Sequence, residues 1–216
     1  MTGRITIDLF TTLDGVAQAP GGPDEDPEGG FPYGGWQAPL FDDAVGREVM
    51  AGIEKLDALV LGRKTYDIFA AYWPRHNDGQ DGAIGRQLNR VPKYVASRSP
   101  LSLDWENSSQ LGEDAAAEVA ALRERHDDIH VIGSLDFVQS LLAAEAYDEL
   151  KLFVYPIVLG QGKKVFPEGA TPANLHLLAP AVTGSSGAVV LRYAPAGKPA
   201  TARAVNARTM TGFLMF

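Results

Sequence analysis

The sequence predicts an α/β protein built on one mixed, mostly parallel sheet of about seven or eight strands, with helices on both faces. Through the first two thirds of the chain, short apolar segments alternate with segments of helical periodicity, which is typical of a parallel sheet. The last third is rich in strand-like segments, which favours antiparallel strands at one edge. The absence of any repeat or long linker indicates a single domain.

The first elements follow directly from the spacing of apolar side chains. Residues 5–10 alternate between apolar and polar side chains, which predicts a strand. A loop rich in glycine and proline follows at residues 16–39, and a loop of this length is typical of a functional lid. Apolar residues at spacings of three and four from Phe41 to Leu56 predict a helix, with Asp42 and Asp43 placed where carboxylates favour a helix start.

Further strands are expected where short apolar runs end in a turn, at residues 57–62, 93–97 and 129–133. Helices are predicted after the first and third of these runs, and between the second and third, where Asp114 is a plausible cap. Residues 76–85 are polar and rich in glycine, so we expect a surface excursion there.

The C-terminal part predicts strands at residues 148–160, 174–182 and 187–194. The last two should pair antiparallel around the turn at residues 184–187. Periodicity then ends, although the sequence finishes with the apolar segment GFLMF. We therefore expect a domain at residues 1–194 and an extension at residues 195–216 that packs on its own domain or on a second subunit.

Composition disfavours several classes of function. There is no cysteine, which removes disulfides, thiolate catalysis, cysteine-type zinc sites and iron–sulfur clusters. A net charge of −8 disfavours nucleic acid as a partner. No apolar run is long enough to span a membrane, and MTGRITIDLF shows no secretory signal pattern, so we expect a cytoplasmic protein. We expect no metal site either, because the acidic segment at residues 24–28 lacks the alternation of a calcium-binding loop.

The three turns that follow the strands at residues 57–62, 93–97 and 129–133 predict a ligand crevice. The carboxyl ends of parallel strands share one edge of a sheet, and helix N-termini there suit phosphate groups. Glycine permits close approach of a phosphate, while arginine, lysine and hydroxyl side chains can bind it. Any one of these turns alone is commonly just a turn, but three in this order favour a ligand with more than one phosphate. The residues concerned are Gly62, Arg63, Lys64, Thr65, Ser97, Arg98 and Gly133.

The segment LVLGRKTY at residues 59–66 resembles the strand-to-helix junction of dihydrofolate reductases, where a Gly-Arg-x-Thr turn holds the phosphates of NADPH. The chain also contains, in this order, TTLDG, GGW, PKYVASR, IHVIGS and DELKLFVYPIVLGQGKKVF. This combination is similar to that of stand-alone bacterial proteins related to the reductase domain of the riboflavin-pathway deaminase/reductase. The resemblance covers about residues 3–194. It implies the dihydrofolate-reductase-like three-layer fold, a homodimer, and hydride transfer from NADPH to a small, pterin-like or ribosylaminopyrimidine-like substrate.

The same resemblance implies roles for individual residues. Cofactor-binding residues would be Gly62, Arg63, Lys64, Thr65, Ser97, Arg98, Ile132, Gly133, Ser134 and Leu135, with Arg98 a candidate for the 2′-phosphate. Asp14 would be the catalytic carboxylate nearest the nicotinamide; alternatively it is a turn residue. Substrate-binding candidates are Trp36, Asp43 and Gln161. Trp36 either stacks on the substrate or anchors its loop. The turn that contains Gln161, Gly162 and Lys163 either reaches the substrate pocket or caps the edge of the sheet.

The sequence also departs from dihydrofolate reductases. The position about 16 residues before Gly62, where a pterin-binding carboxylate is expected, is Gly46, which disfavours dihydrofolate as the substrate. The expected glycine pair after IHVIG is reduced to Gly133-Ser134. A protein that binds a flavin or a nucleotide in the same crevice, without turnover of NADPH, is the alternative.

Overall fold

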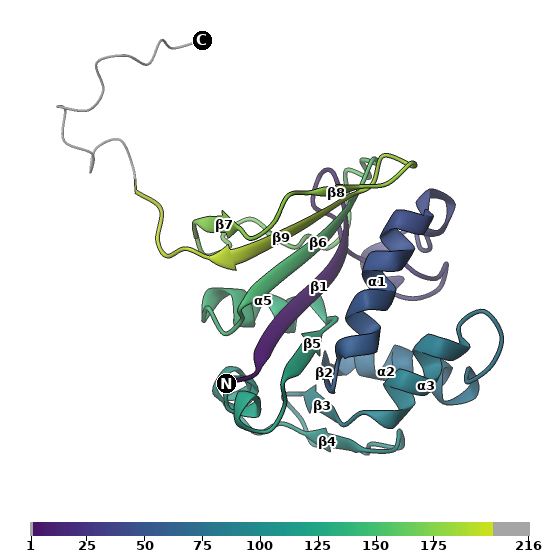
Figure 1. The fold of residues 1–216 in the computed structure, drawn as a ribbon, viewed down its shortest axis with the longest axis vertical. Helices are drawn as coiled ribbons and strands as arrows, with labels where there is room; N and C mark the ends of the chain where they lie inside the picture. The colour runs from purple at the N-terminus through teal and green to yellow at the C-terminus, as the bar shows by residue number, and fades with distance from the viewer. Residues whose placement is uncertain (1, 201–216) are drawn as a thin grey trace, which may run out of the picture.

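A nine-stranded mixed sheet forms the centre of the computed structural model, which describes residues 2–200 (Figure 1). The strands are β1 (Arg4–Thr12), β2 (Ala58–Gly62), β3 (Lys93–Ala96), β4 (Ser108–Gln110), β5 (Asp128–Val131), β6 (Glu149–Tyr155), β7 (Leu175–Leu177), β8 (Val182–Thr183) and β9 (Val189–Pro195). The helices are α1 (Asp43–Lys55), α2 (Arg63–Tyr72), α3 (Gly82–Arg90), α4 (Ala115–Ala121) and α5 (Leu135–Ala143). Short 3-10 turns are η1 (Glu28–Gly30), η2 (Ala38–Leu40), η3 (Trp73–Arg75) and η4 (Leu122–Glu124).

The strand order is β4-β3-β2-β5-β1-β6-β9-β7, with β8 also paired to β9. All pairs from β4 to β6 are parallel, whereas β9 is antiparallel to β6, β7 and β8. This arrangement confirms the predicted mixed α/β sheet with its antiparallel edge.

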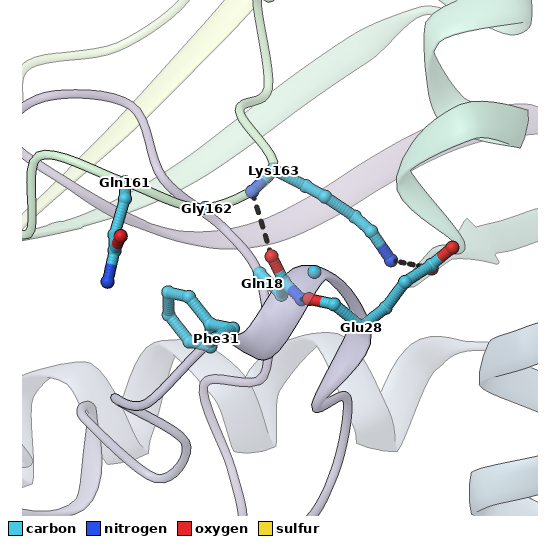
Figure 2. Close-up of a pocket in the computed structure, with 7 residues that line it drawn as sticks. Gln18, Glu28, Phe31, Gln161, Gly162 and Lys163 are labelled. Carbon is cyan, nitrogen blue, oxygen red and sulfur yellow. Dashed lines mark hydrogen bonds and ion pairs between the residues drawn. The ribbon is translucent and has the colours of Figure 1, made fainter.

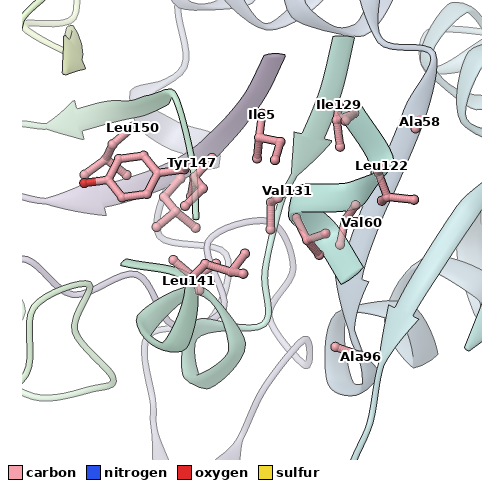
Figure 3. Packing of buried hydrophobic residues seen from close by; sticks show 14 of the residues in the cluster. Ile5, Ala58, Val60, Ala96, Leu122, Ile129, Val131, Leu141, Tyr147 and Leu150 are labelled. Carbon is pink, nitrogen blue, oxygen red and sulfur yellow. The ribbon is translucent and has the colours of Figure 1, made fainter. Parts of the chain in front are cut away.

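Helices cover both faces of the sheet. In β2, Ala58 and Val60 face the layer of α4 and α5, as Figure 3 shows for the surrounding core. Leu59 and Leu61 face the opposite layer of α1, α2 and α3. Successive strand residues point to opposite faces, so the continuous apolar run DALVLG follows from burial on both sides.

One α-helix and one strand were not predicted. Helix α3 overlaps the segment expected to be a surface excursion; its buried residues are Gly82, Gly85 and Leu88, and two glycines obscure its periodicity. A Cβ at Gly85 would lie 1.7 Å from the carbonyl oxygen of His76, so the helix packs directly against backbone. Strand β4 is a short, polar edge strand without apolar alternation. The strand predicted at residues 174–182 is instead divided into β7 and β8, which both pair with β9.

The C-terminal extension begins as a continuation of the fold. Strand β9 reaches Pro195, and the N–H of Ala196 donates to the carbonyl of Asn174 at 2.8 Å. The N–H of Asn174 in turn donates to the carbonyl of Gly197 at 2.7 Å. Residues 201–216 lie outside the described part of the chain, so the predicted packing of the extension, like the predicted homodimer, stays a prediction.

Helix α1 starts at a cap that also fixes the turn between β8 and β9. Asp42 Oδ1 accepts the N–H groups of Ala44 and Val45, both at 3.0 Å. Its Oδ2 accepts the N–H and the hydroxyl of Ser186 at 2.9 and 2.7 Å. A Cβ at Gly184 would lie 2.0 Å from Oδ2, so this turn requires glycine. Hydrogen bonds from Val45 and Ser186 hold the pKa of Asp42 at about 2.

We expect Asp42→Ala to lower the free energy of unfolding at neutral pH by about 1–2 kcal/mol, since a helix cap and a turn contact are both lost. The folded pKa of Asp42 lies below the ordinary value of 3.8, so the wild-type advantage should be present above about pH 4 and shrink as the pH falls towards 2. Urea denaturation measures both effects. Asp43→Ala, at an exposed position one residue later, is the matched control and should cost less than about 0.5 kcal/mol; equal losses for the two variants would contradict the assignment.

Candidate active site

The first and third predicted turns meet at the carboxyl ends of the neighbouring strands β2 and β5. Gly62 and Ser134 are the N-cap residues that precede α2 and α5, and neither caps its own helix with a side chain. Instead, Ser134 Oγ accepts the N–H of Thr65, in the first turn of the other helix, at 3.1 Å. The N–H of Gly62 donates to the carbonyl of Gly133 at 2.7 Å. Two helix N-termini, each with a positive dipole end, therefore lie side by side.

Glycine is required here because the two turns touch. A Cβ at Gly62 would lie 2.8 Å from the backbone nitrogen of Ser134, and one at Gly133 would lie 2.7 Å from Thr65 Oγ1. Gly133 also has a φ of 139°, in a region that favours glycine, and the Gly133–Ser134 peptide bond is cis. Both glycines were predicted to permit close approach of a phosphate, which stays a prediction; in the structure they allow the two turns to pack together.

The second predicted turn lies beside the first, because β3 is the other neighbour of β2. Arg63 Nη1 lies 3.4 Å from Ser99 Oγ, and its Nε lies 3.4 Å from Asp67 Oδ2. Both contacts are at the long limit of hydrogen bonding, so they constrain the exposed guanidinium weakly. Ser97 Oγ is engaged within its own turn, donating to the carbonyl of Ser99 at 2.8 Å, while Arg98 is exposed. Ser99 was not predicted, although it directly follows the Ser-Arg pair that was.

Asp14 connects the end of β1 to the segment after β6. Its Oδ1 accepts the hydroxyl of Thr12 at 2.6 Å and the N–H of Leu159 at 3.2 Å, and its Oδ2 accepts the N–H of Gly160 at 2.8 Å. The hydrogen bond from Thr12, supported by those from Gly160 and Leu159, lowers the pKa of Asp14. A carboxylate held in its ionised form is poorly suited to donating a proton. The arrangement favours the turn role over the catalytic one.

The two remaining candidates before β2 differ in exposure. Trp36 is only 6% exposed, donates its indole N–H to the carbonyl of Gln18 at 2.8 Å, and packs edge-on against Tyr155. That is the geometry of a loop anchor, the second of its two predicted roles. Asp43 is exposed on the first turn of α1, whereas its neighbour Asp42 is engaged as the cap.

Gln161 lines a cavity of about 320 Å³ between the long loop and the turn after β6 (Figure 2). Its other walls are Gln18, Glu28, Gly29, Phe31, Gly162 and Lys163. A cavity of this size suits a small ligand. A second cavity, of about 830 Å³, is lined by Tyr147 and by residues of α5 and of the segment 165–175, and none of the predicted site residues lines it.

The acidic segment at residues 24–28 lies at this same cavity. Lys163 Nζ lies 2.6 Å from Asp26 Oδ2 and 2.5 Å from Glu28 Oε2, and Lys64 also pairs with Glu28. Of the residues at this cavity, Gln18 and Glu28 were not predicted as site residues, whereas Lys163 belongs to the turn that was. Between residues 2 and 200, no three or more His, Asp or Glu side chains are grouped so that they could hold a metal ion.

The chain matches the RibD C-terminal domain over residues 4–189 and belongs to that family. It is similar to the uncharacterized protein YyaP of Bacillus subtilis (strain 168), with 26% identity over 196 residues, which are 88% of this chain and 94% of YyaP. Among helices of the described residues, none is long and apolar enough to cross a membrane.

Two solved structures share the fold at low sequence identity. A pyrimidine reductase-like protein from Corynebacterium diphtheriae aligns with a TM-score of 0.58 and 13% identity, covering 90% of this chain and 92% of that protein. Dihydrofolate reductase from Enterococcus faecalis, complexed with NADP(H), aligns with a TM-score of 0.54 and 15% identity, covering 90% and 98%. The predicted dihydrofolate-reductase-like fold is therefore confirmed.

Proposed function

We propose that this protein is an NADPH-dependent reductase that transfers hydride to a small heterocyclic substrate. The observation that carries the proposal is the convergence of two helix N-termini at the ends of β2 and β5, with Arg63 and Lys64 on the first turn of α2. The first N–H groups of a helix have no acceptor within it, and they bind phosphate readily. Cationic side chains at a helix N-terminus are repelled by the positive end of the helix dipole. A bound anion is attracted to the side chains and to the dipole, and so offsets this repulsion.

The donors at this edge fit a dinucleotide that carries an additional phosphate. Arg63, Lys64 and Thr65 would hold the phosphates on α2, and Gly133 to Leu135 would lie under the pyrophosphate at the start of α5. Arg98, exposed on the adjacent turn, would bind the 2′-phosphate. When bound, NADPH supplies the hydride, and the protein supplies orientation and electrostatics. Membership of the RibD C-terminal domain family and the fold shared with dihydrofolate reductase support a reductase-type function.

The cavity beside Gln161 is the proposed place for the substrate. Phe31 offers an aromatic surface there, and Gln161 offers an amide for hydrogen bonding. We assign Asp14 the role of positioning the end of β1, because its carboxylate already accepts hydrogen bonds from three donors. Water would then supply the proton to the substrate.

Among substrates of this kind, the sequence disfavours dihydrofolate. Gly46 occupies the position of α1 where a pterin-binding carboxylate is expected, and glycine has no side chain to supply one. Membership of the RibD C-terminal domain family favours a ribosylaminopyrimidine-like compound over a pterin.

Calorimetric titration of the purified protein with NADPH, NADH and FMN tests the proposal. We expect NADPH to bind more tightly than NADH by at least about tenfold, because a 2′-phosphate gains a charge-assisted contact to arginine. A screen for NADPH consumption against ribosylaminopyrimidines and pterins would then identify the substrate class. Failure of the folded protein to bind NADPH would overturn the proposal, and tighter binding of FMN would favour the flavin-binding alternative.

A further inference from the structure

One carboxylate oxygen joins the cofactor turn to the substrate cavity. Glu28 Oε2 accepts from the ammonium group of Lys64, on the first turn of α2, and from that of Lys163, after β6. Figure 2 shows Glu28 and Lys163 reaching towards each other beside the cavity. Lys163 has a second partner in Asp26, at 2.6 Å, whereas Glu28 is the carboxylate that contacts Lys64.

The backbone that carries Glu28 is held independently of these ion pairs. Gln18, which is buried, donates from Nε2 to the carbonyls of Asp26 and Glu28, both at 3.0 Å. Its Oε1 accepts the N–H of Lys163 at 3.0 Å. A change limited to the carboxylate of Glu28 therefore leaves the loop and the turn after β6 connected.

The charge and the exposure of Glu28 and Lys64 allow a phosphate to replace Glu28 as the partner of Lys64. Hydrogen bonds from Lys163 and then Lys64 lower the pKa of Glu28 to about 2, so it carries a full negative charge at neutral pH. The side chains of Lys64 and Glu28 are 53% and 55% exposed, and such surface pairs are weak. A phosphate group that is also bound by α2 and Arg63 can displace Glu28 from Lys64. Glu28 then keeps Lys163, whose side chain is less exposed.

We propose that Glu28 is an internal competitor of the cofactor: its carboxylate takes the position on Lys64 that a phosphate of NADPH requires, and it moves to Lys163 alone when the cofactor binds. The loop between β1 and α1 would thereby set the affinity for an anionic cofactor. This inference rests on the proposed function, because it needs NADPH as the ligand of the turn.

Calorimetric titration of NADPH into Glu28→Gln and Asp26→Asn variants tests the competition. Each substitution removes one negative charge from the same loop, but Asp26 pairs with Lys163 and not with Lys64. We expect Glu28→Gln to lower the Kd by about three- to tenfold, the size of a weak ion pair plus relief of repulsion from the phosphate. Asp26→Asn should leave the Kd within about twofold of wild type.

A double-mutant cycle with Lys64→Met separates direct competition from general charge effects. In that background, Glu28→Gln should change the Kd no more than Asp26→Asn does. Two results would overturn this inference while leaving the proposed function standing. One is an equal change in Kd for Glu28→Gln and Asp26→Asn in the wild-type background. The other is a decrease in Kd on Glu28→Gln that is as large in the Lys64→Met background as in wild type. Absence of NADPH binding by all folded variants would overturn the proposed function, and the inference with it.

Discussion

Arg63→Ala should weaken NADPH binding by about 10- to 100-fold while changing the free energy of unfolding by less than about 0.5 kcal/mol. Arg63 is exposed, and its contacts with Asp67 and Ser99, both at 3.4 Å, contribute little to the fold. As the first residue of α2 it opposes the helix dipole, so its removal costs the helix nothing. Arg63 should therefore contribute to the affinity for a bound phosphate and hardly at all to the stability of the unliganded fold.

Titration calorimetry and urea denaturation measure the two quantities on the same variant. Arg90→Ala is the matched control, because Arg90 is an exposed arginine on the last turn of α3, at the end that leads into the start of β3. Arg63→Lys should give an intermediate Kd, since lysine keeps the charge but loses the bidentate geometry. A Kd for Arg63→Ala equal to that of Arg90→Ala would remove Arg63 from the cofactor site.

The features that sequence could predict are those fixed by local pattern and by the geometry of parallel sheets. The apolar run before Gly62 indicates a buried strand, and Asp42 and Asp43 lie where carboxylates favour the start of a helix. The carboxyl ends of parallel strands necessarily share an edge. For that reason the turns at Arg63, Ser97 and Gly133 could be placed together before their contacts were known.

Contacts between distant segments were not predictable in the same way. Glu28 and Lys163 are 135 residues apart, and nothing in the local pattern pairs an acidic loop with one particular lysine. Helix α3 was missed because the packing of Gly85 against backbone leaves no apolar side chain to mark that face. Asp14 illustrates a third limit, because a turn residue and a catalytic carboxylate look alike until hydrogen-bond partners are known.

A related limit concerns β1, whose alternation of apolar and polar residues suggests that one face of the strand is exposed to solvent. In the structure Asp8, one of the polar residues of β1, instead joins a charged cluster around the buried side chain of His130, beneath α1. His130 is only 6% exposed; its Nδ1 lies 2.5 Å from Asp8 Oδ2 and its Nε2 lies 3.2 Å from Asp128 Oδ1. A Cβ at Gly52 would lie 3.2 Å from the imidazole, so α1 lies directly over the ring. On the same face, Lys151 donates to the carbonyl of Glu48 at 2.8 Å.

This cluster should make the fold less stable as the pH rises through about 9. Burial alone would lower the pKa of His130, but the charges and hydrogen bonds of Asp8 and Asp128 outweigh it and raise the pKa to about 9, from an ordinary value of 6.5. The folded state therefore holds the proton more tightly than the unfolded state. The stabilisation is fully present below about pH 6.5, is lost as the pH rises through about 9, and amounts to as much as about 3 kcal/mol.

Urea denaturation of wild type and His130→Gln at about pH 6 and about pH 9.5 isolates this contribution. The wild-type advantage should shrink by about 2–3 kcal/mol between the two conditions. Lys93 titrates in the opposite sense, because burial lowers its pKa to about 8, but it is present in both proteins and cancels in the difference. Should the variant fail to fold, an NMR titration of wild-type His130 gives the same answer, with a midpoint near 9 expected. A midpoint near 6.5 would show that the two carboxylates do not hold a charged imidazole beneath α1.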